Sequence, residues 1–172
     1  MELGIKGKKA VVTGGATGIG KAIALALAHE GVQVSISSRN DKTLQAALAE
    51  LGGSAAGHHA VQCNITDEDG PTNLCRRIKE EFGHPDIVVN NVGDTLGVTD
   101  PFCPISDWRR IFRLNVEVHV EVNNSFIPYM REQRWGRILN VSAGASLENR
   151  APCHTAQPKP RSRPIPDQWA EC

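Results

Sequence analysis

The stretch that decides the fold is KKAVVTGGATGIGKAIALALAHEG, residues 8–31. A short run with β-branched residues leads into several glycines, and the apolar residues that follow recur at helical spacing until Gly31. This pattern predicts a strand, a glycine turn and a helix. Glycines let the backbone approach a pyrophosphate closely, and the start of a helix offers free N–H groups to an anion. The order of these elements favours a dinucleotide-binding turn over an ordinary tight turn.

The chain continues to alternate between strands and helices as far as Gly144. The expected strands cover 32–39, 58–66, 85–93 and 137–144, and the expected helices cover 40–53, 66–83 and 105–136, the second starting nearer 71. Asn40 or Asp41 is the expected N-cap of helix 40–53, which Gly52 ends. Because crossovers between parallel strands are right-handed, the pattern predicts an α/β fold, a Rossmann-like, doubly wound parallel sheet of about five strands.

The end of the sequence departs from this alternation. Five of the ten prolines lie between Pro152 and Pro166. Proline interrupts helices and the interiors of sheets. The length of 172 residues suits one domain. We therefore expect an NAD(P)-binding Rossmann domain over residues 1–150 and an irregular, proline-rich tail over residues 151–172.

The composition argues against two classes of partner. Lys plus Arg equals Asp plus Glu, 19 against 19, so no basic field is available for nucleic acid or anionic lipid. No apolar run reaches the length of a signal peptide or a membrane span. We expect a cytoplasmic protein, with an organelle as the alternative, that acts on a small molecule. Its five cysteines include no C-x-x-C pair, which favours reduced thiols and no metal site.

Four motifs occur in the order of one known family. The glycine turn reads T-G-x-x-x-G-x-G, NNVG ends the fourth expected strand, Asn115 lies in FRLNVE, and GRILNVSA forms the fifth strand. Over residues 7 to about 156 the chain resembles the short-chain dehydrogenase/reductase family, with Val92 in place of the usual alanine. The resemblance implies hydride transfer between a nicotinamide cofactor and a carbonyl, alcohol or enoyl substrate.

The resemblance also implies dimers or tetramers. We expect the chain to lack the family's C-terminal strands, its substrate loop and its main dimer helix, because nothing after Gly144 continues the alternation. Whether this chain forms the family's homo-oligomers is therefore left open.

The implied cofactor site uses residues at the ends of the first four strands. Arg39 follows the second strand, where an acidic residue suits the ribose of NAD and a basic one suits the 2′-phosphate of NADP. Since a guanidinium pairs well with phosphate, we expect NADP(H) to be preferred over NAD(H), with Asp41 as the group that would serve NAD(H). Asn64 would bond the adenine amino group and Ile65 would flank the ring. The full implied set is Gly14, Thr17, Gly18, Ile19, Gly20, Ser38, Arg39, Asn64, Ile65, Asn91, Val92 and Gly93.

Two residues that the resemblance implies for catalysis precede the tail. In this family a serine orients the substrate carbonyl and an asparagine fixes a water that relays protons. Asn115 matches the asparagine by its register. Ser142 is the candidate serine, although the strand alignment also permits Ala143 at that position, where no hydroxyl would then be present.

The family's catalytic tyrosine has no counterpart. The only tyrosine is Tyr129, within the long expected helix, and no Y-x-x-x-K occurs. With Ser142 as the reference, the family spacing puts Thr155 at the tyrosine position and Lys159 at the lysine position. A threonine hydroxyl is a far poorer acid than a phenol, whose pKa is about 10, so Thr155 cannot simply replace it. Prolines flank Lys159, whereas the family's lysine lies on a helix.

Three interpretations of the function remain open. The chain is an active reductase, loosely similar to the 3-oxoacyl-acyl-carrier-protein and 2,4-dienoyl-CoA reductase branches, or a cofactor-binding chain without activity. The third is a Rossmann-like domain for another nucleotide. For the tail we hypothesise a one-nucleotide frame change near Ala156, because the shifted codons permit A-K-A where the family has its lysine.

Overall fold

The sheet consists of five parallel strands. The computed structural model describes residues 3–100 and 102–142. Within them the strand order is β3-β2-β1-β4-β5. The strands are β1 (Lys9–Val12), β2 (Gln33–Ser38), β3 (His59–Gln62), β4 (Ile87–Asn90) and β5 (Arg137–Asn140). The order reverses at β1, as it does in doubly wound folds, so the predicted α/β class is confirmed. The proline-rich tail and the boundary at residue 150 lie outside the described residues.

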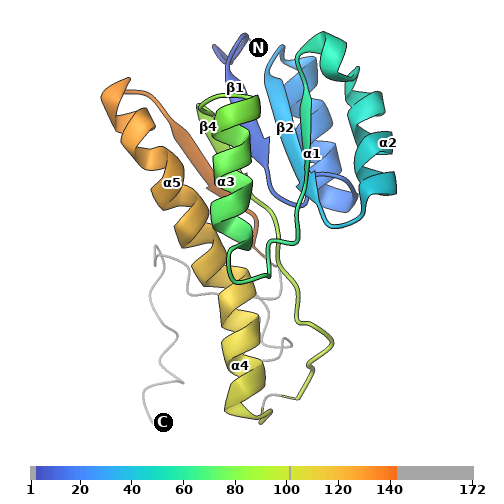
Figure 1. Ribbon diagram of the computed structural model, residues 1–172, viewed down its shortest axis with the longest axis vertical. Helices are drawn as coiled ribbons and strands as arrows, with labels where there is room; N and C mark the ends of the chain where they lie inside the picture. Colours follow the sequence, from blue (N-terminus) through green and yellow to red (C-terminus); the bar gives the residue numbers. More distant parts are fainter. Residues whose placement is uncertain (1–2, 101, 143–172) are drawn as a thin grey trace, which may run out of the picture.

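Helices cover both faces of the sheet (Figure 1). The helices α1 (Gly18–His29) and α2 (Asp41–Leu51) pack on one face, and α3 (Gly70–Glu81) and α5 (Val118–Glu132) pack on the other. A short 3₁₀ turn, η1 (Ser54–Ala56), precedes β3.

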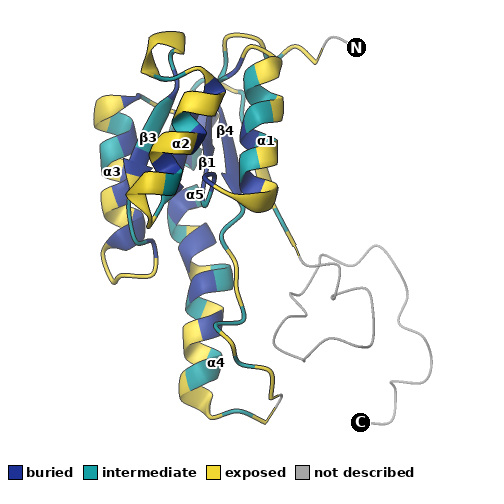
Figure 2. Cartoon of the chain, turned by 90° about the vertical axis from the view of Figure 1, so that its right-hand side faces the viewer, coloured by how far each residue is buried: buried dark blue, intermediate teal, exposed yellow. Residues whose placement is uncertain are grey.

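The long helix expected over 105–136 consists of three segments. The helix α4 (Ile105–Phe112) continues through a π-helical segment, η2 (Arg113–Glu117), into α5, which ends at Glu132. Only Ile111 of α4 is buried, and α4 extends away from the rest of the described chain (Figure 2). The packing against the sheet therefore begins at η2 and α5.

Local signals placed both ends of α2 and the start of α3 correctly. Asn40 is the N-cap of α2, and its side-chain oxygen accepts a hydrogen bond of 3.0 Å from the N–H of Thr43. Gly52 ends the same helix with φ of 107°, a left-handed conformation that suits glycine. Pro71 lies in the first turn of α3, where its missing N–H costs no hydrogen bond.

The strands β1 and β4 are buried on both faces (Figure 2). In β1, Val11 faces α3 and α5 while Val12 faces α1 and α2, and β4 repeats this division with Val88 and Val89. All four side chains are at most 1% exposed. The loops that follow β1 and β4 therefore start from buried strands.

Candidate functional site

A cleft of about 300 Å³ lies at the carboxyl ends of the strands. This is the edge at which open parallel sheets bind ligands, because loops from neighbouring strands diverge there. The residues that line the cleft are Gly14, Thr17, Ser37, Ser38, Arg39, Cys63, Ile65, Thr66, Asn91, Val92, Gly93, Asp94, Leu96 and Leu114. Eight of the twelve predicted cofactor residues, Ile65 included, are among them. The other four, Gly18, Ile19, Gly20 and Asn64, are not.

The glycine turn brings the start of α1 to this cleft. Gly14 and Gly18 have φ of 64° and 55°, which side-chain-bearing residues rarely adopt. A Cβ on Gly20 would lie 2.4 Å from Nδ2 of Asn91 and 2.5 Å from the carbonyl oxygen of Gly14. Thr17 is the N-cap of α1 and makes no side-chain capping hydrogen bond. The first N–H groups of the helix thus lack a side-chain cap, an arrangement suited to an anionic ligand.

Thr13 connects the glycine turn to the loop after β4. Its hydroxyl oxygen accepts hydrogen bonds from the N–H groups of Asn91 at 3.0 Å and Val92 at 3.3 Å. In return, Nδ2 of Asn91 donates to the carbonyl oxygens of Thr13 at 3.1 Å and Gly14 at 3.3 Å. Thr13 is 1% exposed. Sequence reasoning missed this role, because nothing local to Thr13 indicates partners 78 residues away.

The loop after β4 is also fixed by Asn115 in the π-helical segment. The Nδ2 group of Asn115 donates to the carbonyl oxygens of Asp94 and Ile111, both at 2.8 Å. Its Oδ1 accepts from the N–H of Asp94 at 3.2 Å. A Cβ on Gly93 would lie 2.8 Å from the same Oδ1, so the close approach requires glycine. We call Thr13 and Asn91–Asp94 the inner wall of the cleft.

Ser38, Arg39 and Thr66, which follow β2 and β3, form what we call the outer wall. The Ser38 hydroxyl accepts from the N–H of Asn40 at 3.3 Å, and Nε2 of Gln62 donates to the Arg39 carbonyl at 3.3 Å. Arg39 is exposed. Its guanidinium makes no hydrogen bond or ion pair with the part of the chain that the structure describes. The group is thus available to an anion in the cleft.

Of the two residues predicted to contact adenine, only Ile65 lines the cleft. Ile65 is buried and lines the cleft. Asn64 is held within its own loop, because its Nδ2 donates to Oδ1 of Asp67 at 2.6 Å and its Oδ1 accepts from the Thr66 hydroxyl at 2.8 Å. Thr66 reaches the cleft instead. The assignment of Asn64 to adenine stays a prediction.

Leu96 and Cys63 contribute unforeseen parts of the lining. Leu96 has φ of 55°, an outlier for a bulky residue and a form of strain that recurs at binding sites. Burial, and then the charge of Asp67, raise the pKa of the Cys63 thiol. Its Sγ donates to the carbonyl oxygen of Gly70 at 3.3 Å. The thiol therefore stays protonated, which agrees with a structural role.

The remaining predicted catalytic residues are only partly placed. Ser142 is exposed and follows β5 at the carboxyl edge of the sheet. Ala143, Thr155 and Lys159 lie outside the described residues. The structure thus sets Asn115 against the inner wall and leaves the roles of all these residues as predictions.

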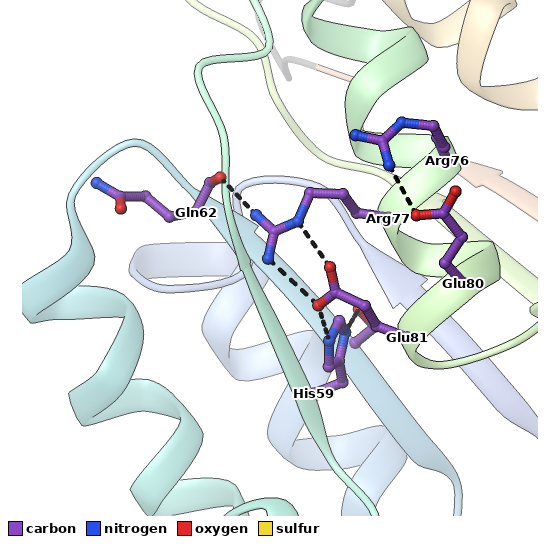
Figure 3. A network of polar contacts seen from close by, with 7 residues as sticks. His59, Gln62, Arg76, Arg77, Glu80 and Glu81 are labelled. Carbon is purple, nitrogen blue, oxygen red and sulfur yellow. Dashed lines mark hydrogen bonds and ion pairs between the residues drawn. The ribbon is translucent and has the colours of Figure 1, made fainter.

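A second polar network lies between β3 and α3 (Figure 3). The His59 ring joins the Ser35 hydroxyl and Oε2 of Glu81, each at 3.1 Å, and Arg77 pairs with Glu81 at 2.8 Å. A serine, a histidine and an acid linked in this way through the imidazole resemble the triad of a hydrolase. However, Ser35 is 0% exposed, so no substrate can reach it. The network fixes α3 to the outer strand, and Arg77 also donates to the Gln62 carbonyl at 3.2 Å.

These features define the class of protein. A doubly wound sheet with a glycine turn before α1 and a cleft at its carboxyl edge is the architecture of dinucleotide-binding domains. Comparison with known families then gives the particular one: residues 8–155 match the short chain dehydrogenase family, and the chain belongs to it.

Relatives of known sequence extend beyond this chain. It is 32% identical over 153 residues to the uncharacterised oxidoreductase YvrD of Bacillus subtilis, covering 86% of this chain and 56% of the relative. It is 31% identical over 139 residues to a 3-oxoacyl-(acyl-carrier-protein) reductase of Thermotoga maritima, covering 81% and 56%. The chain spans about half to three fifths of the length of such relatives.

Solved structures agree with the fold. A 7α-hydroxysteroid dehydrogenase in complex with NADH and 7-oxoglycochenodeoxycholic acid is 30% identical, with a TM-score of 0.78 over 88% of this chain and 59% of that chain. The L-sorbose reductase of Gluconobacter frateurii in complex with NADPH and L-sorbose is 27% identical, with a TM-score of 0.80 over 91% and 60%. Among the helices described for the present chain, none is long and apolar enough to cross a membrane.

Proposed function

We propose that this chain binds NADP(H) in the cleft and serves an oxidoreductase that transfers a hydride between NADPH and a carbonyl, alcohol or enoyl group. The observation that carries the proposal is the pairing of the uncapped start of α1 with the free guanidinium of Arg39, both at one 300 Å³ cleft. The first suits the pyrophosphate and the second suits a 2′-phosphate. NADPH in the sorbose reductase and NADH in the steroid dehydrogenase support nicotinamide binding, and Arg39 favours the phosphorylated form.

The predicted cofactor residues divide by the part of the dinucleotide that they would contact. The glycine turn, with Gly14, Thr17, Gly18, Ile19 and Gly20, would bind the pyrophosphate, and Ser38 with Arg39 would bind the 2′-phosphate. Ile65, with Asn64 or Thr66, would contact adenine. Asn91, Val92 and Gly93 would contact a ribose. The cofactor itself supplies the hydride chemistry when bound.

The catalytic proposal assigns Asn115 to the water that relays protons and Ser142 to the substrate carbonyl. Thr155 and Lys159 would stand at the positions of the family's acid and its lysine. Asn115 already holds the Asp94 backbone from both sides, which supports a fixed position for the relay. We name the substrate class only as small carbonyl, alcohol or enoyl compounds, since the chain spans about half of the length of its relatives.

A second candidate function is cofactor binding without turnover. One observation favours it: Tyr129, the only tyrosine of the sequence, stacks on His84 with ring centroids 4.6 Å apart. His84 precedes β4, so this phenol lies at the edge of the sheet opposite to the cleft. Tyr129 therefore cannot donate a proton to a substrate beside the cofactor.

The deciding experiment combines thermal melting with turnover. NADPH at about 100 times its Kd should stabilise the chain by about 2.7 kcal/mol, while FAD and nucleotide sugars should not. Oxidation of NADPH with a panel of carbonyl and enoyl-CoA compounds then separates the two candidates. A melting shift without turnover supports the second, and no shift with either nicotinamide cofactor contradicts both.

The domain division is tested in the same assay. We propose that residues 1–150 are sufficient for binding, since the described residues that line the cleft lie between Gly14 and Leu114. A chain ending at residue 150 should then keep the NADPH shift of the full chain. Loss of the shift in a folded shortened chain would place part of the cofactor site in residues 151–172.

A further inference from the structure

His119 is a buried polar residue for which the proposed function gives no role. It lies in α5 one helical turn after Asn115, so both side chains project from the same face of the helix. Its neighbours in α5 that pack into the core, Val118 and Val122, are fully buried and apolar. His119 is itself only 7% exposed. An imidazole at such a position costs desolvation free energy, which a specific contact must offset.

The contact that His119 makes is with the inner wall. Its Nε2 lies 2.7 Å from the carbonyl oxygen of Val92. A carbonyl oxygen can only accept, so Nε2 carries the proton and donates. Asn115 fixes Asp94 in the same loop through two hydrogen bonds. The helix therefore fixes the peptide groups on both sides of Gly93 with two side chains spaced by four residues.

Fixing the Val92 carbonyl also fixes the next N–H group. In a trans peptide the carbonyl of one residue and the N–H of the next point in opposite directions. No peptide bond among the described residues is cis. The N–H of Gly93 therefore points away from His119. This N–H has no hydrogen-bond partner in residues 3–100 and 102–142, and Gly93 is exposed and lines the cleft.

We propose that His119 is a positioning residue for the cleft: by holding the Val92 carbonyl, it presents the N–H of Gly93 as a hydrogen-bond donor to an acceptor oxygen of the bound dinucleotide. The inference rests on the proposed binding of NADP(H) in this cleft. It adds a residue whose side chain lies behind the wall and never touches the ligand. It also adds a backbone donor between the two peptide groups that the helix holds.

The test compares three substitutions in the full chain. His119→Gln keeps an N–H donor at a similar reach, whereas His119→Leu removes it at similar volume. We expect the Kd for NADPH to rise roughly tenfold in H119L, the effect of losing about one hydrogen bond, and to stay within about threefold in H119Q. Val122→Ala is the matched control. It removes core packing from the same helix about one turn after His119, and Val122 does not contact the inner wall. It should lower the melting temperature and leave the Kd within about twofold.

A second readout does not depend on the cofactor. Amide exchange of Asp94, whose N–H is bonded to Asn115, should speed up in H119L and not in H119Q or V122A, as followed by NMR without ligand. If H119L does not fold, His119→Asn replaces it, since its shorter amide does not reach Val92. Unchanged exchange and affinity in the donor-free variant, or an equal loss of affinity in V122A, overturns the inference. If the unsubstituted chain does not bind NADPH, the proposed function and the ligand role of Gly93 are both overturned. The amide exchange of Asp94 still decides, in that case, whether His119 fixes the inner wall.

Discussion

The two walls of the cleft are built in different ways. The inner wall is held by three side chains that bond across the fold, Thr13 after β1, Asn115 in η2 and His119 in α5. Thr13 and His119 are buried, and Asn115 is half-buried. The outer wall is held by short-range or exposed contacts, such as that between Ser38 and Asn40. A buried polar contact is costly to lose, and an exposed one is not. We therefore expect fold stability and the position of a bound cofactor to depend on the inner wall, and the choice of cofactor to depend on the outer wall.

The largest expected effect comes from filling the space between the glycine turn and the inner wall. Gly20→Val puts a Cβ within 2.5 Å of both Asn91 and Gly14, so the backbone must shift. We expect the free energy of unfolding, measured in urea, to fall by about 3 kcal/mol and NADPH binding to be lost. Gly18→Ala is the control. It meets no atom within 4 Å and carries only the strain of a φ of 55°, about 1–2 kcal/mol. Equal stability of the two variants would contradict the close approach.

The next effect comes from removing one hydroxyl from each wall. Thr13→Val leaves the N–H groups of Asn91 and Val92 without their acceptor, and we expect a loss of about 2 kcal/mol. Ser38→Ala removes an acceptor from the outer wall and should stay within about 0.5 kcal/mol. Thr13→Ser should recover most of the stability. A Ser38→Ala loss as large as that of Thr13→Val would remove the distinction between the walls.

A smaller effect on the inner wall is expected from pH. Burial lowers the pKa of His119 below 6.5, although its bond to the Val92 carbonyl partly opposes this. Between the two pKa values the unfolded chain binds a proton that the folded chain does not, so stability falls as pH drops below about 6.5. Urea unfolding at pH 7.5 and 5.5 should show a weaker dependence in H119Q. His58, whose pKa burial also lowers, is present in both proteins and cancels in the comparison.

The smallest effect on the fold is expected from Arg39→Ala in the outer wall. Its guanidinium supports no contact among the described residues, so the free energy of unfolding should change by less than about 0.5 kcal/mol. Affinity for NADPH should nevertheless fall by roughly 10- to 100-fold, as for a hydrogen bond to a charged group, with NADH affected little. Lys42→Ala, which removes the same charge outside the cleft, should alter neither affinity. Equal losses for NADPH and NADH in Arg39→Ala would contradict the assignment of the 2′-phosphate.

The sequence predicted what depends on neighbours along the chain. Alternating apolar residues, the cap at Asn40 and the glycine turn identified the strands, helices and cleft. It did not predict contacts whose partners are distant. Thr13 bonds to residues 78 and 79 positions away. The match of Asn64 to the family also gave no sign of its bonds to Asp67 and Thr66 within its own loop, and its contact with adenine stays a prediction.

The π-helical segment Arg113–Glu117 sets a limit on how this chain can evolve. Each residue of an α-helix advances the rotation by about 100°. A deletion within the segment would therefore turn Asn115 and His119 relative to one another, or turn all of α4. The loop residues 95–100 are not subject to this rotational constraint. Single-residue insertions and deletions should therefore accumulate in that loop across natural relatives and be excluded from the five residues that begin at Arg113.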